Sequence, residues 1–273
     1  MIDTYIGFDS AWTDNLKNPG AICAVGIEDG HTLRFYEPRL ASFDEARSLV
    51  ENIRADGNTL IAIDQPTVVP NLTGMRPVDR VAASLATWLG GAVQPANRGR
   101  VGMLCDAAPI WRFLVALQAA QDPERARATT TGLYLMEVFP ALALASLAAG
   151  FCGLRAAPKY NPANRKKFRP ADWGRVAYAA RNESLRLGCG ELAEWCREAA
   201  AIGRPRKVDQ DKLDSILCVL TALRWRLRPR DESLVIGDAI NGYMVLPASP
   251  LVRERLSAAA RKCSVAMDGV APL

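Results

Sequence analysis

The sequence predicts an α/β protein in which helices flank a five-stranded mixed sheet, and three observations support this class. First, three short apolar runs open the chain at residues 4–8, 21–27 and 32–36, and consecutive short strands of this kind indicate an antiparallel start to the sheet. Second, a capped helical segment follows them and leads into an apolar run at 59–63. Third, another strand-like run at 133–139 lies between segments of helical spacing.

Each element has its own signal. The turn Glu28-Asp29-Gly30 separates the second and third strands, as in a hairpin. Ser42 and Glu45 form a capping-box pattern that, with helical spacing over 43–53, predicts a helix that ends near Gly57. Apolar residues at helical spacing predict further helices at 78–89, 109–121, 141–149, 171–187, 191–202 and 210–226, the last capped by Asp209. A hairpin of strands 234–236 and 243–246 and a helix over 250–262 complete the chain.

Length and composition fit one elaborated domain. The chain has 273 residues, of which 49% are hydrophobic and 23% charged, and these shares are typical of a globular protein and disfavour disorder. We expect a single domain over 1–273 that carries two insertions. One is a helical insertion at 76–130, and the other is a basic loop with helices at 150–207.

The distribution of charge along the chain is stronger evidence for a polyanionic partner than the net charge of +5 is. Seven basic residues lie between positions 155 and 175 against the single acid Asp172, although a solvated face would look the same. The seven cysteines show no C-x-x-C spacing and are expected to be reduced core residues. We find no signal peptide and no long apolar run, so we expect a cytoplasmic protein without a membrane partner.

Isolated acids in apolar surroundings are the most informative feature for function. Asp9, Asp64 and Glu137 each lie in or directly after a strand-like run, and Asp211 and Asp214 share one face of the helix predicted at 210–226. A buried charge is costly unless it is paired or coordinates a metal. Oxygen ligands favour Mg²⁺ or Mn²⁺, and two such ions about 3.5–4 Å apart would cleave a phosphodiester with metal-bound water.

Simpler explanations exist for each acid. Asp9 and Asp64 could be turn formers, and Asp211 could favour a helix N-terminus electrostatically. Glu137 interrupts an apolar strand, and only an edge position would turn its side chain to solvent. The single histidine, His31, lies in a predicted hairpin turn away from every acid, which makes a Ser-His-Asp or Cys-His hydrolase improbable.

Several motifs resemble those of one family, the predicted RNase H-like nucleases, a broadly distributed group of unknown function. The matching segments occur in order over nearly the whole chain: Gly7-Phe8-Asp9-Ser10-Ala11-Trp12, Ile63-Asp64-Gln65-Pro66, Pro70 to Arg80, Glu137-Val138-Phe139-Pro140, Asp211 to Ser215, Gly237-Asp238, and Gly242 to Pro247. The resemblance implies an RNase H-like fold, with a five-stranded mixed sheet whose first three strands are antiparallel.

The resemblance also implies which acids form the site. By this comparison Asp9, Asp64, Glu137 and Asp214 are the catalytic metal ligands, and Asp211 is auxiliary. Ribonucleases H proper place a glutamate on the first helix, whereas here the candidate lies on a strand. Glu45 and Glu51 on the first helix are the alternatives.

Candidate substrate contacts lie on the two insertions. Arg76, Asp79 and Arg80 begin a helix, where a helix N-terminus and guanidinium groups could hold a phosphate, although a salt-bridged cap is equally plausible. Lys159 and Lys166 in the basic loop could contact a nucleic-acid backbone. The aromatic side chain next to the first acid, in the segment 7–12, could stack on a base or pack in the core.

The combined prediction is a divalent-metal-dependent nuclease, or a related phosphodiester-cleaving enzyme, that acts on DNA or RNA. One alternative is a nucleic-acid-binding module that keeps the fold without catalysis. Another is an actin-like or sugar-kinase-like phosphotransferase, because those folds also begin with a strand ending in Gly-x-Asp. The glycine-rich phosphate hairpin expected after Asp9 is missing from residues 10–13, which disfavours that alternative.

Overall fold

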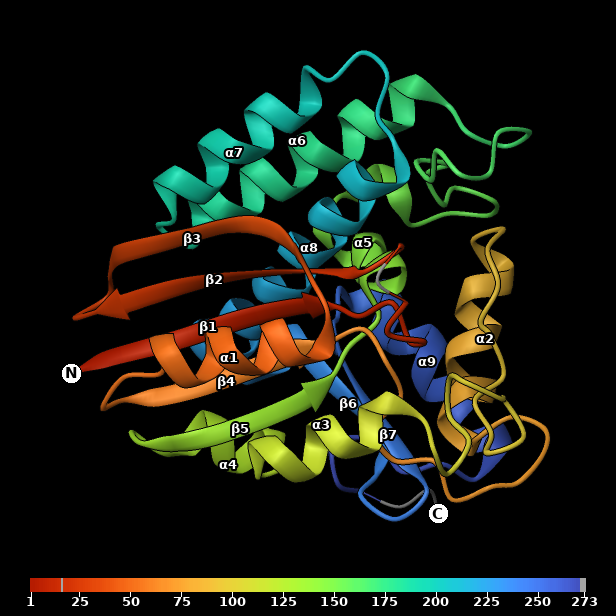
Figure 1. Cartoon of the computed structure of the whole chain (residues 1–273). Helices are drawn as coiled ribbons and strands as arrows, with labels where there is room; N and C mark the ends of the chain where they lie inside the picture. Colours follow the sequence, from red (N-terminus) through yellow and green to blue (C-terminus); the bar gives the residue numbers. More distant parts are fainter. Residues whose placement is uncertain (16, 271–273) are drawn as a thin grey trace.

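The computed structural model describes residues 1–15 and 17–270, and its centre is a five-stranded sheet (Figure 1). The strands are β1 (Ile2–Asp9), β2 (Gly20–Glu28), β3 (His31–Ala41), β4 (Asn58–Ile63) and β5 (Gly132–Glu137). Their spatial order is β3-β2-β1-β4-β5. β2 is antiparallel to β1 and β3, while β4 is parallel to β1 and β5. The predicted α/β class and the antiparallel start of a mixed sheet are therefore confirmed.

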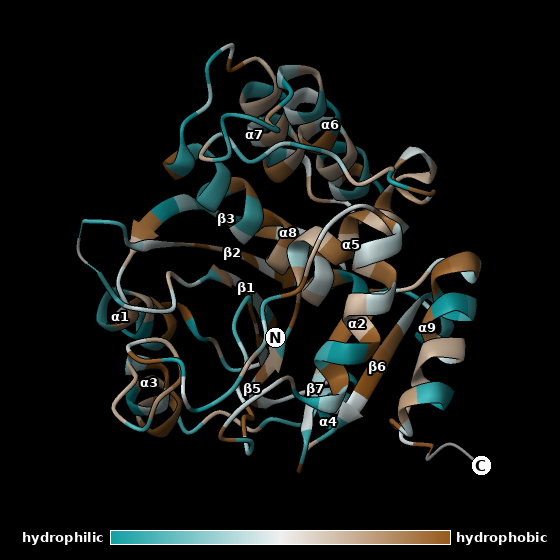
Figure 2. Ribbon diagram, turned by 90° about the vertical axis from the view of Figure 1, so that its right-hand side faces the viewer, coloured by the Kyte–Doolittle hydropathy of each residue, from teal (hydrophilic) through white to brown (hydrophobic). Residues whose placement is uncertain are grey.

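The two faces of the sheet pack against different helices because side chains alternate along each strand. Ile6 and Leu135 belong to a core shared with α1 (Phe43–Ile53) and α3 (Pro109–Leu117). Tyr5 and Met136 belong to the core on the other face, which is shared with α6 (Pro170–Arg186), α7 (Gly190–Ala200) and α8 (Lys207–Leu227). Figure 2 shows α6 and α7 on one side of the sheet, with α1 and α3 on the other.

Helix α8 crosses the centre of the sheet and contacts β1, β2, β3 and β4. Its close approach depends on Gly7 in β1, because a Cβ atom there would lie 2.1 Å from the Ser215 carbonyl oxygen and 2.5 Å from the Val219 nitrogen. Almost every residue from Leu213 to Leu223 is buried, which explains why the helix lacks a clear polar stripe. The first turns of α8 are thereby fixed close to the end of β1.

The remaining elements lie beside the C-terminal ends of the parallel strands (Figure 1). They include α2 (Pro77–Trp88), α5 (Pro140–Leu147), the hairpin β6 (Ser233–Asp238) and β7 (Gly242–Pro247), and α9 (Pro250–Cys263). These elements form a third apolar core. The short helix α4 (Pro123–Ala128) and the single-turn helices Ala149–Phe151 and Arg230–Glu232 complete the secondary structure of the described residues.

Three local predictions differ from the structure. β3 runs to Ala41, beyond the predicted end at 36, because an edge strand tolerates the charged residues and the proline of 37–41. Helix α8 begins at Lys207, so Asp209 is not its cap residue but lies within the first turn, where its carboxylate accepts a hydrogen bond from the Arg206 nitrogen at 2.7 Å. Helix α4 was not predicted, because its six residues are too few for periodicity to register.

None of the helices in the described part of the chain is both long and apolar enough to cross a membrane.

Candidate functional site

Asp9 and Asp64 lie side by side where β1 and β4 end. The last register pair of these parallel strands is Phe8 with Ile63, and the Asp64 nitrogen donates to the Phe8 carbonyl at 2.9 Å. Phe8 and Ile63 both face α1 and α3. By alternation, the aspartates that follow them face the opposite side, where α8 packs. Ligand sites in open α/β sheets lie at such carboxyl ends.

Asp214 reaches the same place from the second turn of α8. Its two carboxylate oxygens accept hydrogen bonds from the Tyr160 hydroxyl at 2.7 Å and from Nε2 of Gln210 at 2.6 Å. Gln210 is one helical turn earlier on α8, whereas Tyr160 comes from the insertion at 150–207. Two elements therefore fix the orientation of this carboxylate, and Asp214 is only 6% exposed.

The pKa of each of the three aspartates is raised. Burial is the largest cause for each, and for both Asp9 and Asp64 the next is repulsion from the charge of Asp214. The pKa of Asp214 is raised to about 6 by burial, while the hydrogen bond from Tyr160 and the charge of Lys207 limit the rise. The charge of Asp214 thus links the carboxylates into one electrostatic unit, and strongly perturbed groups of this kind cluster at functional sites.

Lys207 supplies the positive charge of this unit. Its ammonium group donates a hydrogen bond to Asp211 one turn later and attracts the charges of Asp9 and Asp214. Burial opposes the charged form of Lys207, but these acids raise its pKa above the usual value. The predicted auxiliary acid Asp211 is therefore paired with a lysine at the rim of the aspartate cluster.

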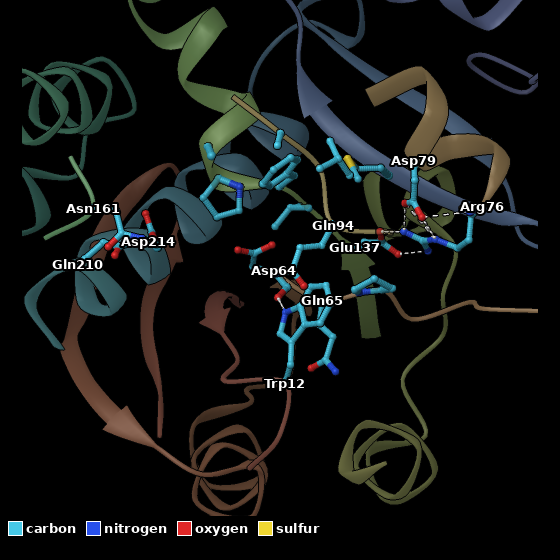
Figure 3. A pocket seen from close by; sticks show the side chains of 18 of the residues that line it. Trp12, Asp64, Gln65, Arg76, Asp79, Gln94, Glu137, Asn161, Gln210 and Asp214 are labelled. Carbon is cyan, nitrogen blue, oxygen red and sulfur yellow. Dashed lines mark hydrogen bonds and ion pairs between the residues drawn. The ribbon is translucent and has the colours of Figure 1, made fainter. Parts of the chain in front are cut away.

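Glu137 is buried in a separate ionic network. It is 1% exposed, and its oxygens accept hydrogen bonds from the Arg76 guanidinium at 2.5 and 2.8 Å and from the Thr67 nitrogen at 3.1 Å. Arg76 also pairs with Asp79 at 2.7 Å, and Figure 3 shows this network beside Asp64. Arg76, which begins the segment predicted as an insertion at 76–130, is thus the partner of Glu137, and the role of Glu137 as a metal ligand stays a prediction.

Strand register explains why Glu137 does not join the aspartates. Its parallel neighbour in β4 is Ile63, one position before Asp64. Met136 packs on the α8 side, so the next side chain points away from that side. A difference of one residue in register thus turns the Glu137 side chain toward Arg76, although Glu137 still lines a cavity with Asp64 and its charge raises the pKa of Asp64.

The predicted substrate contacts fall into two groups. Arg76 and Asp79 are almost fully buried in their salt bridge, and the ammonium of Lys159 donates to the Gly90 carbonyl at 2.6 Å, so these three residues hold the insertions in place. Arg80 is exposed on α2, and Lys166 is exposed in the basic loop. No salt bridge within residues 1–15 and 17–270 involves either of them, which leaves both charges available to a polyanion.

Two cavities flank the aspartate cluster. One of about 340 Å³ is lined by Asp64, Asp214 and the Glu137 network, and Figure 3 shows its side chains. The other, of about 430 Å³, is lined by Asp9, Asp211 and Lys207. The aspartates thus lie between two open spaces, each large enough for part of a small ligand.

The donor set has the chemistry that a hard cation requires, because Asp9, Asp64 and Asp214 offer carboxylate oxygens in the same part of the molecule. Neither Asp9 nor Asp64 has a side-chain hydrogen bond or salt bridge within the described residues, so both carboxylates are open to a cation. As the side chains stand, however, no three His, Cys, Asp or Glu residues in that part of the chain are arranged to hold a metal ion. A bound ion would therefore require the carboxylates to adjust.

Sequence reasoning missed three residues of the site. Lys207 lies one helical turn before Asp211, and Gln210 lies one helical turn before Asp214. This spacing can be read from the sequence and indicates that each pair is in contact. The sequence contains no such signal for Tyr160, because a single aromatic residue in a basic loop does not predict a partner 54 positions away. Only the docking of the insertion brings it to Asp214.

The raised pKa values predict a stability gain when one acid is neutralised. The native state binds the Asp9 proton more tightly than the unfolded chain does, so stability falls as pH rises from the ordinary aspartate pKa, about 4, through the raised native value. Without divalent cations, Asp9→Asn should therefore raise the melting temperature at pH 8 by about 2–4 °C per kcal/mol of relieved repulsion. The gain should vanish near pH 4, where wild-type Asp9 is protonated.

The control for this experiment is Asp44→Asn, which neutralises an exposed aspartate on α1. Thermal melts of both variants and the wild type should be followed across the pH range. Equal melting temperatures for Asp9→Asn and the wild type at every pH would show that the cluster is not electrostatically strained.

The fold and site together define an α/β protein with a carboxylate cluster at the ends of two parallel strands. A family model described as a protein of unknown function (DUF429) matches residues 7–239, and the chain belongs to this family. No curated protein and no solved structure matched the chain. The family description names no activity.

Proposed function

We propose that this protein is a divalent-metal-dependent phosphodiester hydrolase that acts on nucleic acid. One observation carries the proposal: aspartates from β1, β4 and α8 converge, and the charge of Asp214 raises the pKa of both Asp9 and Asp64. Such an arrangement is unfavourable for stability, and a function that needs concentrated negative charge explains its presence. Asp9, Asp64 and Asp214 are the residues that would hold Mg²⁺ or Mn²⁺.

Bound divalent cations would supply an activated water and stabilise charge on the phosphate. The chain's own groups prepare the site. Tyr160 and Gln210 hold the Asp214 carboxylate in one orientation, and the ammonium of Lys207 lies where it could attract a phosphate oxygen. Glu137 has a structural part in this proposal, because it fixes Arg76 and the wall of the first cavity.

Two further features support a nucleic-acid substrate and an RNase H-like architecture. Four basic residues in the loop beside Tyr160 are exposed and have no acidic partner among the described residues: Arg165, Lys166, Lys167 and Arg169. Clustered cations bind the phosphate backbone in a salt-dependent way. A five-stranded mixed sheet whose first three strands are antiparallel agrees with the architecture that the sequence resemblance implies.

The test is cleavage of labelled single-stranded, duplex, hybrid and branched nucleic acids with millimolar Mg²⁺ or Mn²⁺. The wild type should cut at least one substrate, chelation should abolish cutting, and Asp9→Asn or Asp64→Asn should reduce the rate at least about 100-fold. Asp44→Asn, an exposed replacement of the same type, should retain full activity. Equal cutting by the wild type and both site variants would identify a contaminant and refute the proposal.

The second candidate is a nucleic-acid-binding protein without catalysis. It is favoured by one observation, that no three acids in the described residues are arranged to hold an ion as they stand. This candidate predicts salt-sensitive binding that persists in Asp9→Asn and Asp64→Asn. Binding of this kind, without cleavage of any substrate at any metal concentration, would favour it over the hydrolase.

A further inference from the structure

Trp12 has an unusual backbone conformation directly beside the aspartate cluster. Its φ of 57° lies in the left-handed region, which bulky side chains rarely adopt. The conformation is held by a hydrogen bond from the indole nitrogen to the Asp64 carbonyl at 2.9 Å. Strain of this kind persists only where the surroundings enforce it, and it gathers at functional positions. The proposed hydrolysis does not use this side chain.

The indole borders both cavities. Only Trp12 and Gln94 line the 340 Å³ cavity as well as the 430 Å³ cavity among the described residues. Trp12 is partly exposed, and Figure 3 shows it below Asp64. A planar group that entered either space would therefore meet an aromatic ring next to the acids.

The second cavity has the chemistry to recognise a polar, uncharged ring system. Besides Trp12 and the charged Asp9, Asp211 and Lys207, it is lined by hydroxyl and amide side chains, among them Ser10, Thr13, Asn15 and Asn18. Within the described part of the chain, no hydrogen bond engages the side-chain nitrogen of Asn15 or either polar side-chain atom of Asn18. Such amides can donate to and accept from the edge of a nucleobase.

We propose that Trp12 is a stacking platform for one unpaired nucleobase next to the phosphodiester at the aspartates. The substrate class is then single-stranded nucleic acid, or a nucleotide splayed out of a duplex. A base inside a duplex is covered on both faces by its neighbours and cannot present a face to the indole. This inference rests on the proposed function for the position of the phosphate, and it adds the form of the substrate.

The test measures binding without cleavage, by fluorescence anisotropy of labelled oligonucleotides in the presence of a chelator. The ligands are a single strand, the same strand with abasic residues, and its duplex. The wild type should bind the single strand most tightly. Trp12→Ala should weaken that binding roughly 5- to 100-fold and remove the preference for bases over abasic residues. Trp12→Phe, which keeps an aromatic ring, should retain most of the affinity for the single strand and most of the preference for bases over abasic residues.

Several results would overturn the proposal: no binding of any oligonucleotide by the wild type, equal binding of normal and abasic strands, or unchanged discrimination in Trp12→Ala. If circular dichroism shows that Trp12→Ala does not fold, the wild type and Trp12→Phe are still compared on the normal and the abasic strand. Equal binding of these two strands would overturn the proposal. Base-dependent binding without metal-dependent cleavage supports the stacking site and refutes the hydrolase. Metal-dependent cleavage, together with unchanged discrimination between normal and abasic strands in Trp12→Ala, supports the hydrolase and refutes the stacking site.

Discussion

Replacing Gly7 with alanine should destabilise the protein by about 3 kcal/mol or more. The new Cβ atom would lie 2.1 Å from the Ser215 carbonyl oxygen and 2.5 Å from the Val219 nitrogen. Both are backbone atoms of α8, so no side-chain rotation relieves the contact and the helix must move away from β1. Because α8 also carries Asp214, activity should fall by more than the loss of folded protein explains.

Gly26→Ala in the neighbouring strand β2 is the matched control. A Cβ atom at Gly26 would have its nearest neighbour at 3.6 Å, an ordinary van der Waals distance. Urea denaturation of the two variants gives the comparison, and Gly26→Ala should stay close to the wild type. Equal stability of the two variants would mean that α8 does not press on β1 at Gly7.

Replacing Arg76 with methionine should cost about 3–5 kcal/mol of stability. The guanidinium is fully buried and neutralises both Glu137 and Asp79, so its removal leaves two buried carboxylates without a cation. Burial raises the pKa of Glu137 and Arg76 counteracts that rise, so the pKa should rise further in the variant. The variant should therefore regain stability as the pH falls and Glu137 is protonated.

Arg47→Met provides the comparison for Arg76→Met. Arg47 pairs with Glu51 at 2.7 Å on the surface of α1, and exposed pairs of this kind contribute at most about 1 kcal/mol. Combining Arg76→Met with Glu137→Gln should recover part of the loss, since one unpaired charge is then removed. Denaturant titrations at two pH values distinguish these outcomes, and an Arg76 variant no weaker than the Arg47 variant would contradict the interpretation.

Local signals in the sequence were sufficient for most elements of the fold. The Ser42 and Glu45 pattern predicted the start of α1, and the structure contains both hydrogen bonds of the capping box, although the helix ends at Ile53 and not near Gly57. Apolar runs located β1, β2, β4 and β5, because burial on both faces leaves little choice of residue type, and the hairpin turn at 28–30 helped to locate the exposed edge strand β3. Such features depend on neighbours in sequence, so they can be inferred without knowing the tertiary structure.

The candidate site was less predictable because it depends on register and on distant partners. The order of the strands brought Asp9 and Asp64 together, but whether Glu137 faced the same side depended on a one-residue offset between β4 and β5. Arg76 was singled out for its charge, yet its partner Glu137 is 61 positions away. Pairing of that kind is decided by how an insertion docks, and periodicity carries no information about docking.

The position of α8 has a consequence for how the chain folds during synthesis. This helix covers the face of β1 and β2 that bears Tyr5 and Cys23, yet it follows those strands by most of the length of the chain. Until the ribosome has released α8, that apolar face lacks its covering helix. We therefore expect nascent chains that stop before Lys207 to be bound by chaperones and to aggregate when released. The step that completes the core also brings Asp214 to Asp9, so the aspartate cluster cannot form earlier.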